Sequence, residues 1–228
     1  MVFGRHSVFG EGGPIFLEWL QGDGSTGYVD TGFVVQDYMT RMTIEAAYQG
    51  GNTNNYYAFG AVVMAGCESD TSSSERKMFG FSPRHKDRQI WMNVGLGRAW
   101  NNPAYAGSWD GGSFHVINVG AVSGSQISAT LDGVDVGMSL VSAGSFSDLP
   151  TESQTIFASK ADGGYYLLSS QYKVRRVAYK LDGVFLADFR AAAVNKIYGF
   201  YDVVGRKFAA GHGSLTAGSV IAKNGGGV

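Results

Sequence analysis

Hydrophobic and polar residues alternate with a period of two along much of this chain. In residues 41–49, RMTIEAAYQ, apolar side chains occupy every second position and most of the positions between them are polar. Successive side chains of a β-strand point to opposite faces of the sheet, so this pattern predicts a strand with one buried face. Similar alternation, rich in β-branched and aromatic residues, predicts strands within 27–35, 55–63, 77–82, 89–95, 114–122, 126–137, 154–159, 172–189 and 196–204. We expect roughly ten to thirteen strands in total.

The turns between these strands point to antiparallel pairing. The sequence LDGV occurs at residues 131–134 and again at 181–184, each time between apolar runs. An Asp-Gly pair in this setting favours the tight turn whose twist matches two antiparallel strands. The flanks of the two copies differ, so they are no repeat, and no strand alternates with an amphipathic helix. The sequence therefore predicts an all-β fold, an antiparallel two-sheet β-sandwich.

The composition and the glycine-rich segments suggest one domain with short extensions. The 228 residues are 44% hydrophobic, enough for one core, and the 34 glycines predict many turns. We expect an N-terminal arm over residues 1–13, the sandwich over 14–220 and a Gly-rich tail over 221–228. Residues 66–76, which are polar and rich in serine, predict a long exposed loop between strands.

Charge and cysteine content limit the partners and the compartment. A formal net charge of -1 gives no long-range field for phosphate backbones, so we expect no nucleic acid partner. Cys67 is the only cysteine, which excludes an intramolecular disulfide and a cysteine-built zinc site. No apolar run is long enough for a signal peptide or a membrane span. These features predict a soluble product, made in a cytoplasm, with no membrane insertion.

Three ordered segments resemble a known family. They are LEWLQGDGSTGYVDTGFVV at 17–35, GSFHVINVGAVSGSQISATLDGV at 112–134, and the closing stretch of 172–192 followed by YGFYDVVGRKFAAGHGSLTAG at 198–218. Together they resemble the concanavalin A-like, laminin G-like jelly rolls found in gut bacterial surface proteins and bacteriophage structural proteins. The resemblance implies a jelly-roll β-sandwich. It implies less about activity, because the family includes sugar binders, adhesion modules and phage structural proteins.

The carboxylates and histidines do not form a catalytic pattern. Jelly-roll glucanases place two or three carboxylates on alternate residues of one strand, because two of them must flank one glycosidic bond. Glu45 is alone on its predicted strand, and Glu68 and Asp70 fall in the serine-rich segment. The four histidines are scattered without metal-ligand or catalytic spacing. The sequence predicts no enzyme, no catalytic residue and no cofactor.

Three Asp-Gly pairs were considered as a calcium site. Laminin G-like modules often hold one calcium between loops, and Asp110, Asp132 and Asp162 each lie beside a glycine. A lone Asp-Gly pair is more often a turn, so we predict no metal.

The strongest candidate binding site is the stretch GRAWNNPAYAGSWDGG at residues 97–112. Sugars stack their C–H faces on aromatic rings while amides and carboxylates bind their hydroxyl groups. The candidate ligand-binding residues are Trp100, Asn101, Asn102, Tyr105, Trp109 and Asp110. The other interpretation is that these rings pack against the end of the core or against a neighbouring subunit. Both interpretations remain open from the sequence.

Two basic clusters have a simple interpretation. The sequence KVRRVAYK at 173–180 alternates charge with apolar residues, and RHKDR at 84–88 contains its own aspartate. Both predict solvated surfaces or subunit contacts.

These observations lead to one functional hypothesis and one alternative. The hypothesis is a non-enzymatic structural protein of a bacteriophage virion, a capsid decoration, head-fibre or tail component with a lectin-like domain. Its partners would be other virion proteins or copies of itself, with host glycans as a further contact. The alternative is a carbohydrate-binding or adhesion module at a bacterial surface, which would place the chain outside the cell and require an export route.

Overall fold

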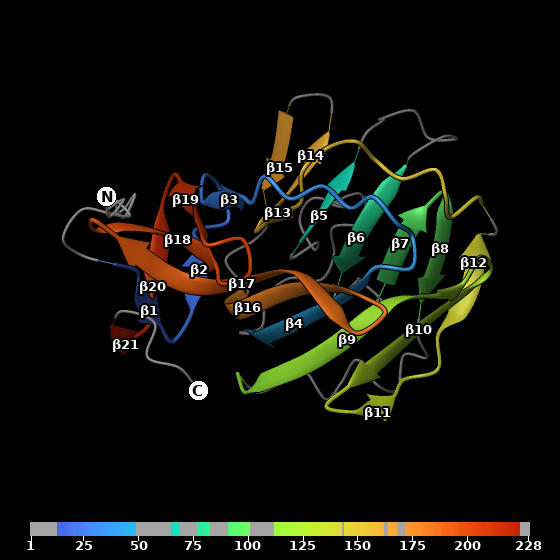
Figure 1. Ribbon diagram of the computed structural model, residues 1–228, viewed down its shortest axis with the longest axis horizontal. Helices are drawn as coiled ribbons and strands as arrows, with labels where there is room; N and C mark the ends of the chain where they lie inside the picture. The colour runs from blue at the N-terminus through green and yellow to red at the C-terminus, as the bar shows by residue number, and fades with distance from the viewer. Residues whose placement is uncertain are drawn as a thin grey trace, which may run out of the picture.

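The described part of the chain is built from β-strands. The computed structural model describes residues 13–48, 65–68, 77–82, 91–100, 112–142, 144–161, 164–167 and 172–223. These residues form strands and no helix, and their strand pairings are all antiparallel (Figure 1). The predicted all-β, antiparallel β-sandwich is therefore confirmed. Helices capable of crossing a membrane do not occur among the described residues. The predicted strand 55–63 and the cluster 84–88 lie outside them.

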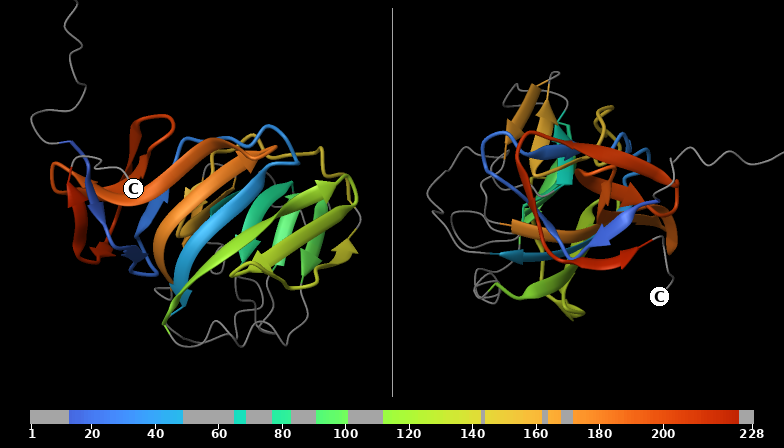
Figure 2. Two further views of the ribbon diagram at one scale, coloured as in Figure 1. Left: turned by 60° about the horizontal axis from the view of Figure 1, so that its bottom comes forward. Right: turned by 90° about the vertical axis from the view of Figure 1, so that its left-hand side faces the viewer.

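The strands form two layers that are joined along one side. The first layer contains, in order, β10 (Gln126–Leu131), β9 (Phe114–Ser123), β4 (Arg41–Tyr48), β16 (Tyr172–Leu181), β17 (Val184–Val194), β18 (Ile197–Asp202) and β19 (Lys207–His212). The second contains β3 (Tyr28–Asp30), β13 (Thr155–Ile156), β5 (Ala65–Glu68), β6 (Met78–Ser82), β7 (Trp91–Gly95), β8 (Gly97–Trp100) and β12 (Ser139–Ser142). Pairing of β19 with β3 joins the layers, and Figure 2 shows β4, β9 and β16 in front of β6 and β7.

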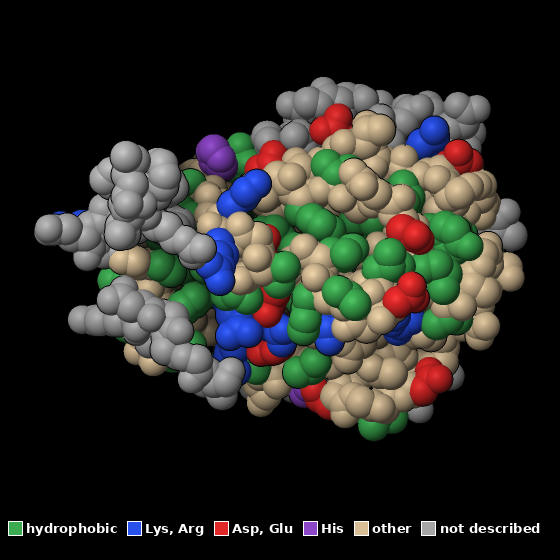
Figure 3. All heavy atoms as spheres, in the orientation of Figure 1, with side chains coloured by type: hydrophobic (Ala, Val, Ile, Leu, Met, Phe, Trp, Pro, Cys, Tyr) green, Lys and Arg blue, Asp and Glu red, His purple; other side chains and the backbone are tan. Residues whose placement is uncertain are grey.

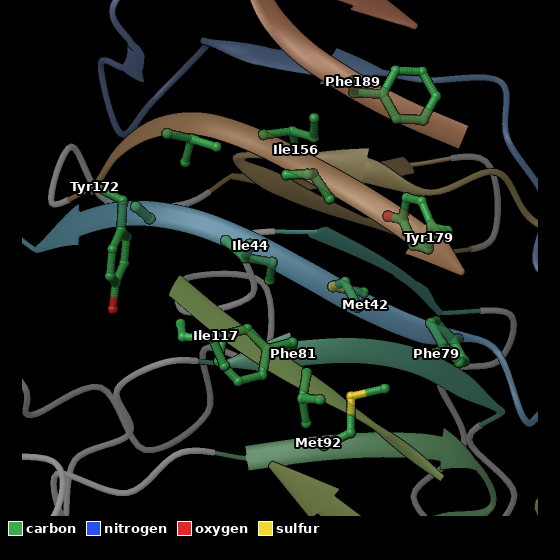
Figure 4. Packing of buried hydrophobic residues seen from close by; sticks show 14 of the residues in the cluster. Met42, Ile44, Phe79, Phe81, Met92, Ile117, Ile156, Tyr172, Tyr179 and Phe189 are labelled. Atoms are coloured by element: carbon green, nitrogen blue, oxygen red, sulfur yellow. The ribbon is translucent and has the colours of Figure 1, made fainter. Parts of the chain in front are cut away.

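The core lies between these layers. Met42 and Ile44 of β4 are fully buried, as the alternation in residues 41–48 predicts. They face Phe79 and Phe81 of β6 and Met92 of β7, so inward side chains of both layers meet (Figure 4).

Two outward residues of β4 depart from the simple alternation. Ala47 is fully buried and Thr43 is only 8% exposed, and the Thr43 hydroxyl group donates a hydrogen bond to Oδ1 of Asn118 on the neighbouring strand (2.7 Å).

Both LDGV segments form the expected tight turns. Asp132 and Gly133 have φ angles of 50° and 84°, and Asp182 and Gly183 have 49° and 81°. Positive φ at both central residues defines the type I′ turn, which requires residues that tolerate the left-handed region. The first turn connects β10 to β11 (Val134–Asp135) and the second connects β16 to β17. The hairpin predictions are confirmed.

The predicted number of strands is wrong. The described residues alone contain 21 strands, many of them only two to four residues long. An alternating pattern needs more positions than this to be recognised, and the pairing partner decides whether so short a segment is a strand. The predicted loop 66–76 is wrong at its start for the same reason, since 66–68 belong to β5, which pairs with β6 and β13.

Short strands from both ends of the chain complete one end of the sandwich. β1 (Ile15–Leu17) pairs with β17, and β2 (Leu20–Gly22) pairs with β16. On their other edges they pair with β21 (Val220–Lys223) and β20 (Leu215–Ala217). Figure 1 shows β1 and β21 at one end of the molecule and β8 and β12 near the other. β14 (Ala158–Ala161) pairs with β15 (Gly164–Leu167) to form a small two-stranded sheet that is separate from these layers.

An aspartate organises the turn between β2 and β3. The Asp23 carboxylate accepts hydrogen bonds from the backbone N–H groups of Ser25 (2.9 Å), Thr26 (2.7 Å) and Gly27 (2.8 Å) and from the Ser25 and Thr26 hydroxyl groups. The Thr26 hydroxyl oxygen also accepts a hydrogen bond from the N–H of Ser214. These donors favour the ionised carboxylate and hold the pKa of Asp23 well below its ordinary value, with the Thr26 hydroxyl contributing most.

The low pKa of Asp23 predicts a loss of stability in acid. Because the folded-state pKa lies below the unfolded value of about 4, its contribution is present above that pH and is lost as the pH falls through the folded pKa. The Asp23→Asn variant should therefore lose less of its free energy of unfolding than the unmodified chain does when acidified below about pH 4. Urea unfolding at a series of pH values measures this difference. Asp135→Asn is the control, because it also removes one exposed carboxylate from a turn and leaves the hydrogen bonds to Asp23 in place. The same dependence of stability on pH in Asp23→Asn and the unmodified chain would contradict the prediction.

Candidate functional site

The predicted sugar-binding loop begins at the end of β8. The backbone of Trp100 pairs with Trp91 of β7 and with Ser139 of β12. The remaining candidates, Asn101, Asn102, Tyr105, Trp109 and Asp110, lie outside the described residues. The choice between a sugar platform and a packed edge therefore stays a prediction.

The sheet face next to this loop carries a tryptophan, an amide and an arginine. Strand register places Trp91, Asn93 and Arg98 on the face of β7 and β8 that points away from the core. The Arg98 guanidinium lies over the Trp91 ring, 5.1 Å from its centroid. Asn93 lies opposite Gly80 of β6, which in turn lies opposite Gly66 of β5.

This face is packed rather than open. Trp91 is 8% exposed and Asn93 is 5% exposed, so the Trp91 ring offers little surface for stacking. Trp91, Asn93 and Arg98 are not among the binding residues predicted from the sequence. The alternation in residues 89–95 was the available signal, because it places Trp91 and Asn93 on the same side of the strand.

An ion-pair cluster lies on the outward face of β4, β16 and β17. Arg176 donates from Nε to Oδ1 of Asp188 (2.6 Å), from Nη2 to Oδ2 of Asp188 (3.0 Å) and from Nη1 to Oε1 of Glu45 (3.2 Å). Arg190 donates to Oδ2 of Asp188 (3.1 Å). Asp188 is 3% exposed, whereas the Arg190 side chain is 45% exposed. The buried carboxylate thus fixes one guanidinium and holds a second at the surface.

Strand register explains the cluster. Arg176 lies opposite Arg190 on one side and opposite Glu45 on the other. Burial would lower the pKa of Arg176, but its hydrogen bonds and charge interactions with Asp188 and Glu45 outweigh burial and raise it. Glu45 thus pairs with an arginine that lies 131 residues away in the sequence.

Cations along β16 cover aromatic rings from neighbouring segments. Lys173 Nζ lies 4.4 Å from the centroid of Trp19, and the Arg175 guanidinium lies 4.0 Å from that of Phe114. Lys180 Nζ lies 4.1 Å from the centroid of Phe185. Each contact is an attractive cation–π interaction.

These cations define a positively charged surface. We call it the cationic face, and its six cations are Arg41, Lys173, Arg175, Arg176, Lys180 and Arg190. Among the described residues, the carboxylates that pair with these cations are Glu18, Glu45 and Asp188, which leaves the described part of the face with a formal excess of three positive charges. Figure 3 shows Lys and Arg side chains gathered over β16 and β17 with carboxylates among them. The whole chain has a net charge of -1, so the charge is unevenly distributed.

Of the three aspartates beside glycines that could have offered a calcium ligand, Asp132 is described, and protein groups hold it. Its Oδ1 accepts the N–H of Val116 (2.8 Å), and its Oδ2 lies 2.7 Å from Nδ1 of His115. Burial would raise the pKa of Asp132, but the hydrogen bonds from His115 and Val116 lower it. Asp110 and Asp162 lie outside the described residues, among which no group of three or more metal-ligating side chains occurs.

Neither a protein-family model nor a curated protein matches this chain.

Proposed function

We propose that this chain is a non-enzymatic structural protein of a bacteriophage particle, a capsid decoration, head-fibre or tail component that displays a concanavalin A-like jelly roll. The resemblance in residues 17–35, 112–134 and 172–218 suggests this family, and an antiparallel β-sandwich agrees with it at the level of architecture. Its partners in this proposal are other virion proteins or further copies of itself, and its location is the virion.

The observation that carries the proposal is the placement of β1 and β21, the first and last described strands. Ile15 of β1 pairs directly with Lys223 of β21, and both strands lie away from β8 and β12 (Figure 1). Attachment next to β1 or β21 would therefore leave the β8 end of the sandwich facing outward. Many copies displayed in this way would convert weak single contacts with a host surface into avidity.

The carboxylates of the ion-pair cluster favour a non-enzymatic role. Glycoside hydrolysis needs one carboxylic acid that keeps its proton near neutral pH beside one ionised carboxylate. Glu45 and Asp188 instead share the guanidinium of Arg176. An arginine bound to both carboxylates suits a structural ion pair.

Fractionation of particles tests the proposal directly. A lysate of the native source is separated on a density gradient, and peptides of this chain are sought by mass spectrometry. We expect them in the particle band. Peptides confined to soluble or cell-envelope fractions would refute the virion assignment and support the bacterial-surface alternative.

A truncation tests how the chain is anchored. Removing residues 1–13 leaves every described strand intact, because β1 begins at Ile15. We expect this variant to remain folded, as measured by thermal unfolding, and to be absent from the particle band. Removal of residues 224–228 is the matched control and should leave incorporation unchanged. Normal incorporation of the 1–13 truncation would show that the anchor lies elsewhere.

A further inference from the structure

We propose that the cationic face binds an anionic polysaccharide, one that carries a carboxylate or sulfate group on its sugar units. This inference deepens the proposed function, on which it rests for the expectation of a glycan contact at a host surface. It assigns that contact to the outward face of β4, β16 and β17.

The charge of this face is partly available to a ligand. The Arg190 side chain is 45% exposed and that of Arg175 is 38% exposed. Among the described residues, Arg190 donates to the Asp188 carboxylate, and Arg175 donates from Nε to the backbone carbonyl of Glu18 (3.3 Å) and lies 3.9 Å from the Glu18 carboxylate. A guanidinium has five N–H donors. Donors therefore remain for a carboxylate or sulfate, which planar guanidinium groups bind well.

The buried aspartate prepares the face for binding. Asp188 holds Arg176 through two hydrogen bonds and Arg190 through one. Arginine side chains positioned in advance lose less conformational entropy when they bind a ligand. Asp188 thus serves as a positioning residue for the exposed arginine.

The shape and composition of the face suit a sugar polymer. The cations of β16 extend from Lys173 to Lys180, a length of about 23 Å, which suits an extended chain. Phe185 remains 36% exposed beside Lys180, whereas the Phe114 ring is covered by Arg175. Exposed ring surface offers stacking for the C–H faces of sugars, whereas a flexible acidic peptide gains less from it.

The test is binding of the full chain to polygalacturonate, with neutral dextran, polyglutamate and duplex DNA as comparison ligands. We expect binding to polygalacturonate that weakens as salt is added, because surface ion pairs are screened. The variant Arg175→Gln/Lys180→Gln/Arg190→Gln should bind about tenfold more weakly. The control Lys196→Gln/Arg206→Gln/Lys207→Gln removes three exposed cations at the turns beside β18 and should bind normally.

Several outcomes would overturn the inference. They are no binding to polygalacturonate at low salt, equal binding to polyglutamate or DNA, or equal weakening in the control variant. If the triple variant fails to fold, Arg175→Gln/Lys180→Gln leaves all partners of Asp188 in place and should still bind more weakly. If the chain is found in the particle band but does not bind polygalacturonate, this inference is refuted and the virion proposal stands. If the chain binds polygalacturonate but is absent from the particle band, the virion proposal is refuted and this inference stands.

Discussion

Replacing Asp188 by asparagine should lower the free energy of unfolding by about 3 kcal/mol. Asp188 is 3% exposed and neutralises Arg176, whose side chain is only 21% exposed. Without the Asp188 charge, Glu45 still binds Nη1 of Arg176, but Nε and Nη2 lose their carboxylate partner in a largely buried setting. The free energy comes from urea unfolding monitored by circular dichroism.

The exposed partner of the same carboxylate supplies the control. Arg190→Gln removes a guanidinium that is 45% exposed and bound to Oδ2 of Asp188. Ion pairs at the surface contribute about 0–1 kcal/mol, so the free energy of unfolding of this variant should be close to that of the unmodified chain. If Asp188→Asn lowers the free energy of unfolding no more than Arg190→Gln does, the cluster is not a structural ion pair.

The fold was predictable where the sequence contains a long local signal. The alternation in residues 41–48 predicts β4, and the Asp-Gly pairs predict the turns at residues 132–133 and 182–183. Periodicity and turn chemistry are both properties of neighbouring residues, so they can be read from one sequence. β1 and β13, by contrast, are two or three residues long, and their strand partners come from distant parts of the chain.

The cationic face was only half predictable. The alternation of KVRRVAYK indicated an exposed strand and left open a contact role. What it could not indicate is that Arg176 binds Glu45 and Asp188, because both contacts depend on how β4 and β17 pair with β16. Sheet register is decided by packing across the whole core, and residues far apart in sequence become neighbours only through it. The same limit applies to Trp91 and Arg98, which come together through the pairing of β7 with β8.

A substitution at Gly95 should disturb the start of β8 and thereby the predicted loop. Gly95 has a φ angle of 57°, in the left-handed region that glycine favours. A Cβ atom added there would collide with the carbonyl oxygen of Ser145 and lie 2.7 Å from that of Phe146. The Ser145 oxygen also accepts the N–H of Leu96 (2.9 Å), so it is not free to move away. Gly95→Ala therefore combines backbone strain with a backbone collision.

We expect Gly95→Ala to lower the free energy of unfolding by about 3 kcal/mol. Gly133→Ala separates the two causes, because Gly133 has a φ angle of 84° but no atom within 4 Å of an added Cβ. The free energy of unfolding of Gly133→Ala should fall by about 1 kcal/mol from backbone strain alone. Urea unfolding of both variants gives the difference, which measures the collision with the segment around Ser145. Equal losses of free energy would mean that residues 145–146 move aside easily and do not fix the position of β8. The expected difference would mean that residues 145–146 fix the position of β8.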